Sequence, residues 1–279
     1  MVHPLTPPTF NSTDLVIEVI AERQNGNNAA YFNGIAAEWG DRVQAYLDNQ
    51  GSPVTVGTWG AIEAHKKKFI RLYSHPADGS AQGIILKSLR THSLTFCPAC
   101  GEMGKPNTLD HYLPKGAYPH FAVIPHNLSP MCDACQGAKL EKTGDATDPK
   151  FFIHPYYDRF SSARIVTISI AAPFETPSFA ISANDELSDP EKALVSAHLR
   201  ELEVEVRFGD FFKEEYRRIL RLVSNMRAGG QNCEAFLRMF KERANLVSPN
   251  SWEHVMYEGI LSNPELMTFL SSGDLPALL

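Results

Sequence analysis

Long apolar runs are missing from this chain, and none approaches the length that a membrane-spanning helix needs. The first ten residues, MVHPLTPPTF, also lack the charged and then apolar order of a signal peptide. Internal repeats and low-complexity tracts are absent as well. We therefore expect a globular, cytoplasmic protein that makes no contact with a membrane.

Charge of one sign is not in large excess. The chain has 26 Lys and Arg against 32 Asp and Glu, which gives a formal net charge of −6. That balance does not indicate a nucleic-acid coat protein, but it leaves nucleic-acid binding open because local charge matters more than the sum. With 43% hydrophobic and 21% charged residues among 279, the composition is that of an ordinary globular protein with one large domain or two to three small ones.

Cysteine is scarce, yet four of the five cysteines form two Cys-x-x-Cys pairs. The pairs are Cys97 with Cys100 and Cys132 with Cys135, and 31 residues separate them. In a reducing compartment such pairs indicate metal ligands before disulfides. Because zinc favours four soft ligands in a tetrahedron, we predict one structural zinc site at these thiolates. The fifth, Cys233, stands in a helical pattern and is expected to be a small buried residue.

The sequence pattern divides the chain into three regions. Residues 1–90 favour helix, beginning at STDLVIEVIAERQ, which opens with a capping signal and carries apolar residues at helical spacing. Residues 91–160 concentrate Gly, Pro, His and Cys, and they show no long helical period before DACQGAKLEK. That composition is typical of a small, loop-rich unit held together by metal rather than by core volume.

Residues 161–279 begin with two strand patterns, RIVTISIAA and SFAIS, and then return to helix. Ser188 or Asp189 supplies the cap of the first helix there, and Pro190 is a first-turn proline. The sequence therefore predicts an α+β fold, in which a mostly helical chain carries a small central unit that contains the paired cysteines.

Within the central region, the stretch TLDHYLPKG places Asp110 next to His111. If this stretch is extended, the two side chains point to opposite faces. A carboxylate can bind a hard divalent ion while an imidazole takes a proton from water, so the pair suits metal-assisted hydrolysis. Taken alone, the pair is weak evidence and favours an ordinary surface or core histidine.

The order of motifs in residues 97–139 resembles the HNH endonuclease family, in bacterial or phage-type members with a four-cysteine structural zinc. The shared elements, in order, are Cys-x-x-Cys, Asp110-His111, Asn127-Leu128, a second Cys-x-x-Cys and a short helical stretch that ends at Lys139. The resemblance implies a ββα-metal, treble-clef-like unit within residues 91–160. It also implies hydrolysis of phosphodiester bonds, with DNA as the expected substrate.

The resemblance further implies a role for each motif position. His111 is the expected general base that deprotonates the attacking water, and Asp110 is an expected ligand of a catalytic Mg²⁺ or Mn²⁺ ion. Asn127 is expected to hold the loop that carries the base, through side-chain hydrogen bonds to the backbone. The zinc at the cysteines is structural and distinct from the catalytic ion.

The chain departs from the family pattern directly after its last paired cysteine. The family usually has His or Asn there as the second metal ligand, whereas this chain has Gln136. Three interpretations are open. Gln136 binds the ion through its amide oxygen with weakened affinity, His154 or Asp158 replaces it, or the site binds nucleic acid without cutting.

Basic residues that could contact phosphate lie in three places. They are Lys115 and Lys139 near the predicted site, the turn Lys66–Lys68 with Arg71, and a helical stretch with Lys213, Arg217, Arg218 and Arg221. The basic turn would look the same if it were an ordinary solvated face, and the helical stretch would look the same if it were an ordinary amphipathic helix. No Walker loop, dinucleotide-binding glycine pattern or helix-turn-helix module appears, so we expect no nucleotide cofactor.

The sequence thus favours a metal-dependent endonuclease whose substrate is nucleic acid, with DNA expected, and which a protein partner restrains or targets. The alternative is a zinc-stabilised nucleic-acid-binding or interaction module with a degenerate, non-cutting site, and Gln136 is its main support. The set of Asp110, His111 and Asn127 argues against a purely structural staple, which has no use for those three residues.

Overall fold

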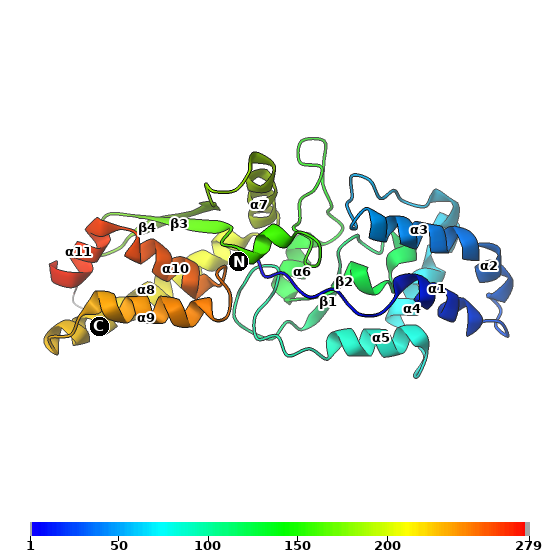
Figure 1. The fold of residues 1–279 in the computed structure, drawn as a ribbon, viewed down its shortest axis with the longest axis horizontal. Helices are drawn as coiled ribbons and strands as arrows, with labels where there is room; N and C mark the ends of the chain where they lie inside the picture. The colour runs from blue at the N-terminus through cyan, green and yellow to red at the C-terminus, as the bar shows by residue number, and fades with distance from the viewer. Residues whose placement is uncertain (1, 277–279) are drawn as a thin grey trace. The chain divides into compact units, whose positions relative to one another are not determined.

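The computed structural model describes residues 2–276 and confirms the α+β class, because helices predominate and two small antiparallel sheets complete the fold (Figure 1). The chain divides into two compact units. The N-terminal unit comprises Pro4–Pro98 and Gly104–Arg159, and the C-terminal unit comprises Ala99–Met103 and the chain from Phe160 onward, with residues 2–3. Within the described residues, no helix combines the length and the apolar character needed to cross a membrane.

This division differs from the three regions predicted from the sequence. The boundary expected after residue 160 lies between Arg159 and Phe160, but no boundary separates residues 1–90 from most of residues 91–160. The first five helices and the central hairpin form one compact unit, because the helices bury their apolar faces against the hairpin and its loops.

The N-terminal unit consists of short helices and one β-hairpin. Its helices are α1 (Ser12–Ala21), α2 (Ala29–Gly34), α3 (Ala36–Asp48), α4 (Lys66–Ser74), α5 (Ala81–Arg90) and α6 (Asp133–Lys139), with the 3-10 helices η1 (Gly60–His65), η2 (Pro119–Phe121) and η3 (Pro125–Asn127). Its strands are β1 (Thr108–His111) and β2 (Leu128–Met131). Helix α1 begins near the predicted position, but its cap is Asn11, whose side chain accepts backbone N–H groups of the first turn.

An aromatic cluster joins α2, α3 and α4. Phe32, Trp39 and Phe69 are almost fully buried, and their ring centroids lie 5.1, 5.6 and 5.8 Å apart. The two pairs that involve Phe69 are edge-to-face, and such packing adds about 0.5–1.5 kcal/mol per pair beyond the gain from burial. Trp39 also donates its indole N–H to the carbonyl of His120 at 2.8 Å, which fixes the β1–β2 connection against α3.

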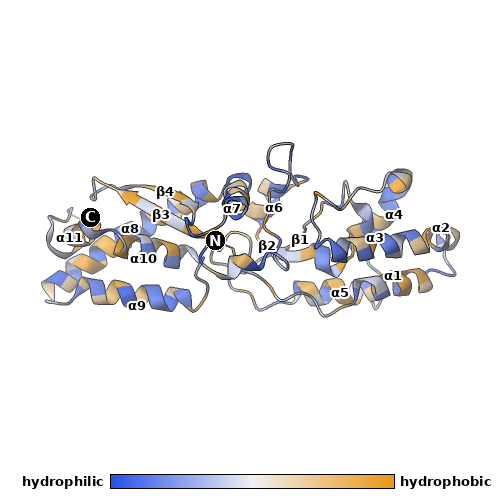
Figure 2. Ribbon diagram, turned by 45° about the horizontal axis from the view of Figure 1, so that its top comes forward, coloured by the Kyte–Doolittle hydropathy of each residue, from blue (hydrophilic) through white to orange (hydrophobic). Residues whose placement is uncertain are grey.

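Helix α5 covers the hairpin. Leu86 of α5 packs in a buried cluster with Leu109 of β1 and Leu128 of β2, and Tyr73 of α4 packs against this cluster. Figure 2 shows that hydrophobic and hydrophilic residues alternate along these helices, as expected when one face is buried. The helices of the first ninety residues therefore form the scaffold that positions β1 and β2.

The C-terminal unit combines a second hairpin with longer helices. Its elements are β3 (Val166–Ala171), β4 (Ser178–Ala183), α7 (Asp189–Glu201), α8 (Val204–Ala228), α9 (Cys233–Asn245), α10 (Trp252–Leu261) and α11 (Pro264–Ser272), and the 3-10 helix η4 (Arg159–Ser162) lies at the sequence boundary. The two predicted strands pair antiparallel, and α7 carries the predicted cap at Ser188, closed into a capping box by Glu191.

Buried contacts connect the parts of the C-terminal unit. Gly259 of α10 lies so close to Ile168 of β3 that a Cβ atom at residue 259 would collide with the isoleucine side chain. The segment Ala99–Met103 packs here as well, since Trp252 donates its indole N–H to the carbonyl of Cys100 at 2.6 Å. Cys233 is buried in the first turn of α9, as expected of a small apolar residue.

Candidate functional site

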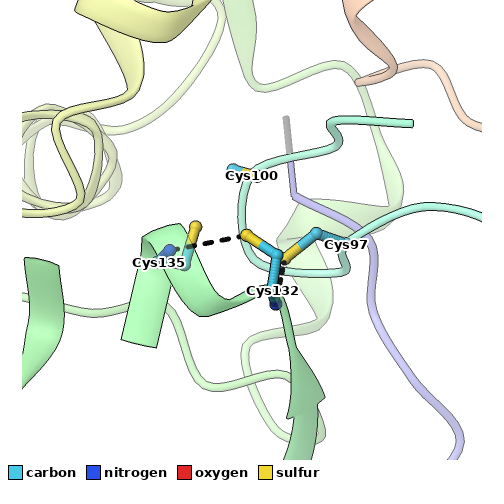
Figure 3. Close-up of side chains that lie close together, drawn as sticks. All are labelled: Cys97, Cys100, Cys132 and Cys135. Carbon is cyan, nitrogen blue, oxygen red and sulfur yellow. Dashed lines mark hydrogen bonds between the residues drawn. The ribbon is translucent and has the colours of Figure 1, made fainter. Parts of the chain in front are cut away.

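The cysteines of the two Cys-x-x-Cys pairs come together. Their four sulfur atoms all lie within 4.8 Å of one another, and none forms a disulfide (Figure 3). Cys97 and Cys100 lie on one loop, Cys132 follows β2, and Cys135 lies in the first turn of α6. The predicted four-cysteine cluster is confirmed.

The cluster has the chemistry of a metal site. Tetrahedral zinc with Zn–S bonds of about 2.3 Å places its sulfurs about 3.8 Å apart, within the observed limit. The N–H of Cys132 donates to Cys97 Sγ and that of Cys135 donates to Cys132 Sγ, both at 3.4 Å, and Arg207 Nη1 lies 3.5 Å from Cys100 Sγ. Donors of this kind stabilise thiolates, so the four cysteines could hold a metal ion such as zinc.

The hairpin and α6 follow one another in the ββα order that the resemblance implies. β1 pairs antiparallel with β2, so that Asp110 lies opposite Ser129 and His111 lies opposite Leu128. Asp110 and His111 are both among the residues that line one pocket.

Asn127 holds the loop that follows His111. Its side chain is fully buried, and its Oδ1 accepts the backbone N–H of Leu113 at 2.7 Å. Its Nδ2 donates to the carbonyls of Leu113 at 3.0 Å and Phe121 at 3.2 Å. Three buried backbone groups thereby gain partners, and the loop is fixed from both sides.

His111 is held in one orientation. Its Nε2 lies 2.9 Å from the carbonyl oxygen of Ala122, and the ring of Tyr73 packs against it edge-on at a centroid distance of 4.4 Å. Because a carbonyl can only accept, Nε2 carries the proton of the neutral imidazole and Nδ1 keeps its lone pair. Burial, and to a smaller extent the cation of Lys115, lowers the pKa of His111 to about 3.

Asp110 is buried beside a cation that the sequence did not predict there. Lys139 of α6 is 1% exposed, its Nζ lies 3.1 Å from Asp110 Oδ2, and it donates to the carbonyl of His111 at 2.6 Å. The ammonium and Oδ2 form a buried ion pair, and this oxygen has no further hydrogen-bond partner among the described residues. Burial raises the pKa of Asp110, and the cation of Lys139 opposes that shift.

The burial of Lys139 corrects one prediction. Lys139 was expected to contact phosphate, but its ammonium is enclosed and faces Asp110 and the carbonyl of His111. Sequence alone places Lys139 at the end of a short helix, where most lysines are solvated. The tertiary contact with β1 decides otherwise.

A pocket of about 370 Å³ opens beside the end of β1. Among the residues that line it are Asp110, His111, Lys115 and Gln136, so four residues singled out from the sequence meet at one place. Carboxylate, imidazole, ammonium and amide groups can together bind a phosphate ester and activate a water molecule.

Two further polar residues line this pocket and were not predicted. Tyr73 comes from α4, and its hydroxyl donates to the carbonyl of Leu109 at 2.8 Å. Glu141 follows α6 and lies over Gly116, where a Cβ atom would collide with its carboxylate. No local pattern could have indicated Tyr73, because its place depends on how α4 packs against β1.

The pocket offers oxygen donors that suit a hard divalent ion. Asp110 and Glu141 bring carboxylates, and Gln136 brings an amide, to the lining of this one pocket. Since Mg²⁺ is usually bound through one or two carboxylates, with water and phosphate oxygens around it, this donor set fits such an ion. Lys139 is the opposing feature, because its ammonium competes for the Asp110 carboxylate.

His154 and Asp158, the suggested substitutes for Gln136, do not line this pocket. Nε2 of His154 lies 3.1 Å from the Tyr46 hydroxyl, and its Nδ1 accepts the N–H of Tyr156 at 3.1 Å. Asp158 accepts the N–H of His154 at 2.5 Å and pairs with a lysine. Both residues therefore have structural contacts, and Gln136 is the position that remains at the pocket.

The basic residues predicted on the C-terminal helices are exposed on α8. They are Lys213, Arg217, Arg218 and Arg221. Lys213 pairs with Asp210 at 3.7 Å, and Arg218 lies 3.6 and 3.3 Å from Glu214 and Glu215. Exposed pairs of this kind add little stability, and the carboxylates partly offset the positive charge of this face, so its contact with nucleic acid stays a prediction.

Comparisons with known proteins give one distant relative. The chain is 28% identical over 186 residues to "Protein ea31" of Escherichia phage lambda, a match that covers 61% of this chain and 62% of the phage protein. The name of that protein describes no activity. No protein-family model matches the chain, and no solved structure matches it.

Proposed function

We propose that this chain is a metal-dependent endonuclease of the HNH type, with DNA as its substrate. The observation that carries the proposal is the single pocket lined by Asp110, His111, Lys115 and Gln136, beside a ββα unit and a four-cysteine cluster. Zinc at the cysteines has a structural role in this proposal. The phage origin of the relative fits a phage-type enzyme.

His111 takes the proton of the attacking water. Because the Ala122 carbonyl holds the Nε2–H, the proton is accepted by the lone pair at Nδ1. The water oxygen forms the new bond to phosphorus as the bond to the leaving sugar oxygen breaks. Asn127 keeps the loop after His111 in place, so the base does not have to be oriented during the reaction.

Charge in the pocket comes from the protein and from a bound ion. Lys115 lines the pocket and would bring a positive charge to a bound phosphate group. Asp110 and Gln136 would hold a Mg²⁺ or Mn²⁺ ion, which supplies charge neutralisation at the phosphate and the leaving oxygen when bound.

A second function is favoured by the contact between Lys139 and Asp110. The ammonium lies 3.1 Å from the carboxylate oxygen that a metal ion would need, and Gln136 is a neutral ligand at best. A chain with this ion pair intact would bind nucleic acid without cutting it. The two functions differ in one property, which is metal-dependent cleavage.

Cleavage of supercoiled plasmid by the purified protein, with Mg²⁺, Mn²⁺ or no divalent ion, separates the two functions. The test variant is His111→Gln, because a glutamine amide can still donate to the Ala122 carbonyl but cannot act as a base at neutral pH. The matched control is His65→Gln, at an exposed histidine on η1.

Metal-dependent nicking that survives in the control but falls at least 100-fold in His111→Gln supports the nuclease, since general-base catalysis contributes about 10²–10⁴-fold. Equal nicking by wild type and His111→Gln, with equal melting temperatures and zinc contents, contradicts the role of His111. Absence of cleavage by wild type with every divalent ion, combined with retention of plasmid on a gel, favours the binding module.

A further inference from the structure

A second pocket of the N-terminal unit is strongly basic. It has a volume of about 420 Å³ and lies where the end of α1, the start of α2 and one face of α4 meet. Four cationic residues line it, namely Arg23, Lys67, Lys68 and Arg71, and His75 lies at its edge. No carboxylate is among its lining residues, so the pocket concentrates charge of one sign in a chain whose net charge is negative.

The helical spacing of α4 produces this concentration. Lys67, Arg71 and His75 recur every four residues and therefore share one side of the helix. Lys68 and Leu72 lie beside them, and Phe32 of α2 supplies the apolar base. Arrangement at i, i+4 spacing places like charges close together, which is destabilising unless an anion lies between them.

Two of the four cations are held by neighbouring groups. Arg23 donates to the carbonyl of Val19 at 2.6 Å and lies 3.6 Å from the carboxylate of Glu22. The Lys68 ammonium donates to the side-chain oxygen of Asn28 and lies over the Tyr31 ring, 5.0 Å from its centroid. Both side chains that line the pocket are thus held in place before any ligand binds, which lowers the entropy cost of binding.

The other two cations, Lys67 and Arg71, are not held by ion pairs among the described residues. Lys67 and Arg71 are exposed, and neither forms an ion pair with any residue that the structure describes. Lys66, the neighbour of Lys67, differs in this respect because it pairs with Glu63. Lys67 and Arg71 therefore leave donors directed to solvent at the mouth of the pocket.

We propose that this pocket binds a phosphate group of a nucleic-acid backbone, at a site separate from the candidate active site. Two arginines offer planar forks that match phosphate oxygens, and two lysines add charge, which is the set of donors that phosphate recognition uses. The pocket is open to solvent and its lining is dominated by cationic side chains, which suit phosphate oxygens, so we expect the contact to be independent of sequence.

The helix geometry keeps the two sites apart. Tyr73, which lines the candidate active site, follows Arg71 by two residues and so projects from the opposite side of α4. The basic pocket can therefore be changed without touching the residues proposed for cleavage. Binding through it does not depend on whether the active site cuts.

The experiment is a charge reversal at the two unpaired cations. Binding of fluorescently labelled single-stranded and duplex oligonucleotides is measured by anisotropy without added divalent ions, for wild type and for Lys67→Glu/Arg71→Glu. The matched control is Lys87→Glu/Lys105→Glu, which changes net charge equally at exposed lysines of the same unit outside both pockets. Inorganic pyrophosphate, titrated by calorimetry, tests for a small phosphate ligand.

The expected result is a loss of oligonucleotide affinity of about tenfold or more in Lys67→Glu/Arg71→Glu, with a change below about twofold in the control. Log affinity should also decrease less steeply with log salt concentration. The magnitude of this slope should be smaller by about 1.4 for single strands and about 1.8 for duplex DNA, because two phosphate contacts are removed.

Equal affinities in wild type and Lys67→Glu/Arg71→Glu would overturn the proposal. Pyrophosphate binding that the double variant abolishes, without any change in oligonucleotide affinity, would assign the pocket to a small phosphate compound and overturn the backbone assignment. Plasmid nicking by the same variants is a separate readout. If the double variant loses binding but still nicks plasmid at high enzyme concentration, its active site is intact and the basic pocket acts in binding. If the wild type does not nick plasmid, the proposed nuclease activity fails, and the proposal for the basic pocket is judged by the binding data.

Discussion

Replacement of Lys139 by Met should destabilise the N-terminal unit by about 3–4 kcal/mol at pH 7. Lys139 and Asp110 are both buried, with their charged atoms 3.1 Å apart, and removal of one partner leaves the other charge without compensation. Breaking a buried pair in this way costs about 3–5 kcal/mol. A stranded Asp110 can instead take up a proton, which costs about 1.36 kcal/mol for each pH unit between its reference pKa and pH 7. Protonation therefore limits the destabilisation to about 4 kcal/mol.

A double-mutant cycle separates the ion pair from simple loss of packing. The cycle uses Lys139→Met, Asp110→Asn and the double variant, each unfolded in urea without added divalent ions and followed by fluorescence and circular dichroism. Asp110→Asn alone should cost less, because Lys139 keeps its bond to the carbonyl of His111. The double variant should recover about 2 kcal/mol or more relative to Lys139→Met, since no carboxylate is then stranded.

The control for this cycle is Lys87→Met, at an exposed lysine on α5, where a change within about 0.5 kcal/mol is expected. A loss below about 1 kcal/mol in Lys139→Met would refute the reasoning. So would free energies that simply add in the double variant, because additive effects mean that Lys139 and Asp110 do not interact.

Three further variants test the rest of the site. Cys132→Ser should lose bound zinc, measured by elemental analysis, and should melt at a lower temperature. The control Cys233→Ser should keep the zinc of the wild type. Full zinc content in both variants would contradict the assignment of the metal site to the four cysteines. Asn127→Ala removes three buried hydrogen bonds, two of them to the backbone of Leu113, so we expect a loss of about 3 kcal/mol in urea unfolding; a loss below about 1 kcal/mol would contradict the loop-holding role. Burial lowers the pKa of His120 to about 3, so the folded state resists its protonation and stability falls as the pH drops from about 6.5 toward 3. Between pH 7 and pH 5, the free energy of unfolding of His120→Leu in urea should therefore fall by about 2 kcal/mol less than that of wild type, and equal falls would contradict this account.

Local patterns predicted the elements whose causes are local. The strands at Val166–Ala171 and Ser178–Ala183 follow from β-branched alternation, and the cap at Ser188 follows from the residues next to it. The four-cysteine cluster could be predicted for a similar reason, because a Cys-x-x-Cys turn already brings two ligands together. In each case a short stretch carries the information.

The parts that could not be predicted depend on contacts across the fold. Lys139 lies in an ordinary helical stretch, and only the packing of α6 against β1 buries its ammonium beside Asp110. Tyr73 precedes His111 by more than thirty residues, and α4 brings its ring to the imidazole. The union of the first ninety residues with the central hairpin follows from apolar contacts such as those of Leu86, whose partners no periodicity identifies.

The shortness of β2 limits how this region can change over evolution. Asn127 directly precedes this four-residue strand and Cys132 directly follows it, so the loop brace and a cysteine of the cluster are joined by Leu128–Met131 alone. One inserted or deleted residue would reverse which face each β2 side chain occupies and would displace one of the two anchors. We therefore expect relatives to keep β2 at the same length. Insertions and deletions should occur instead at the exposed turn near Ala146 and Thr147.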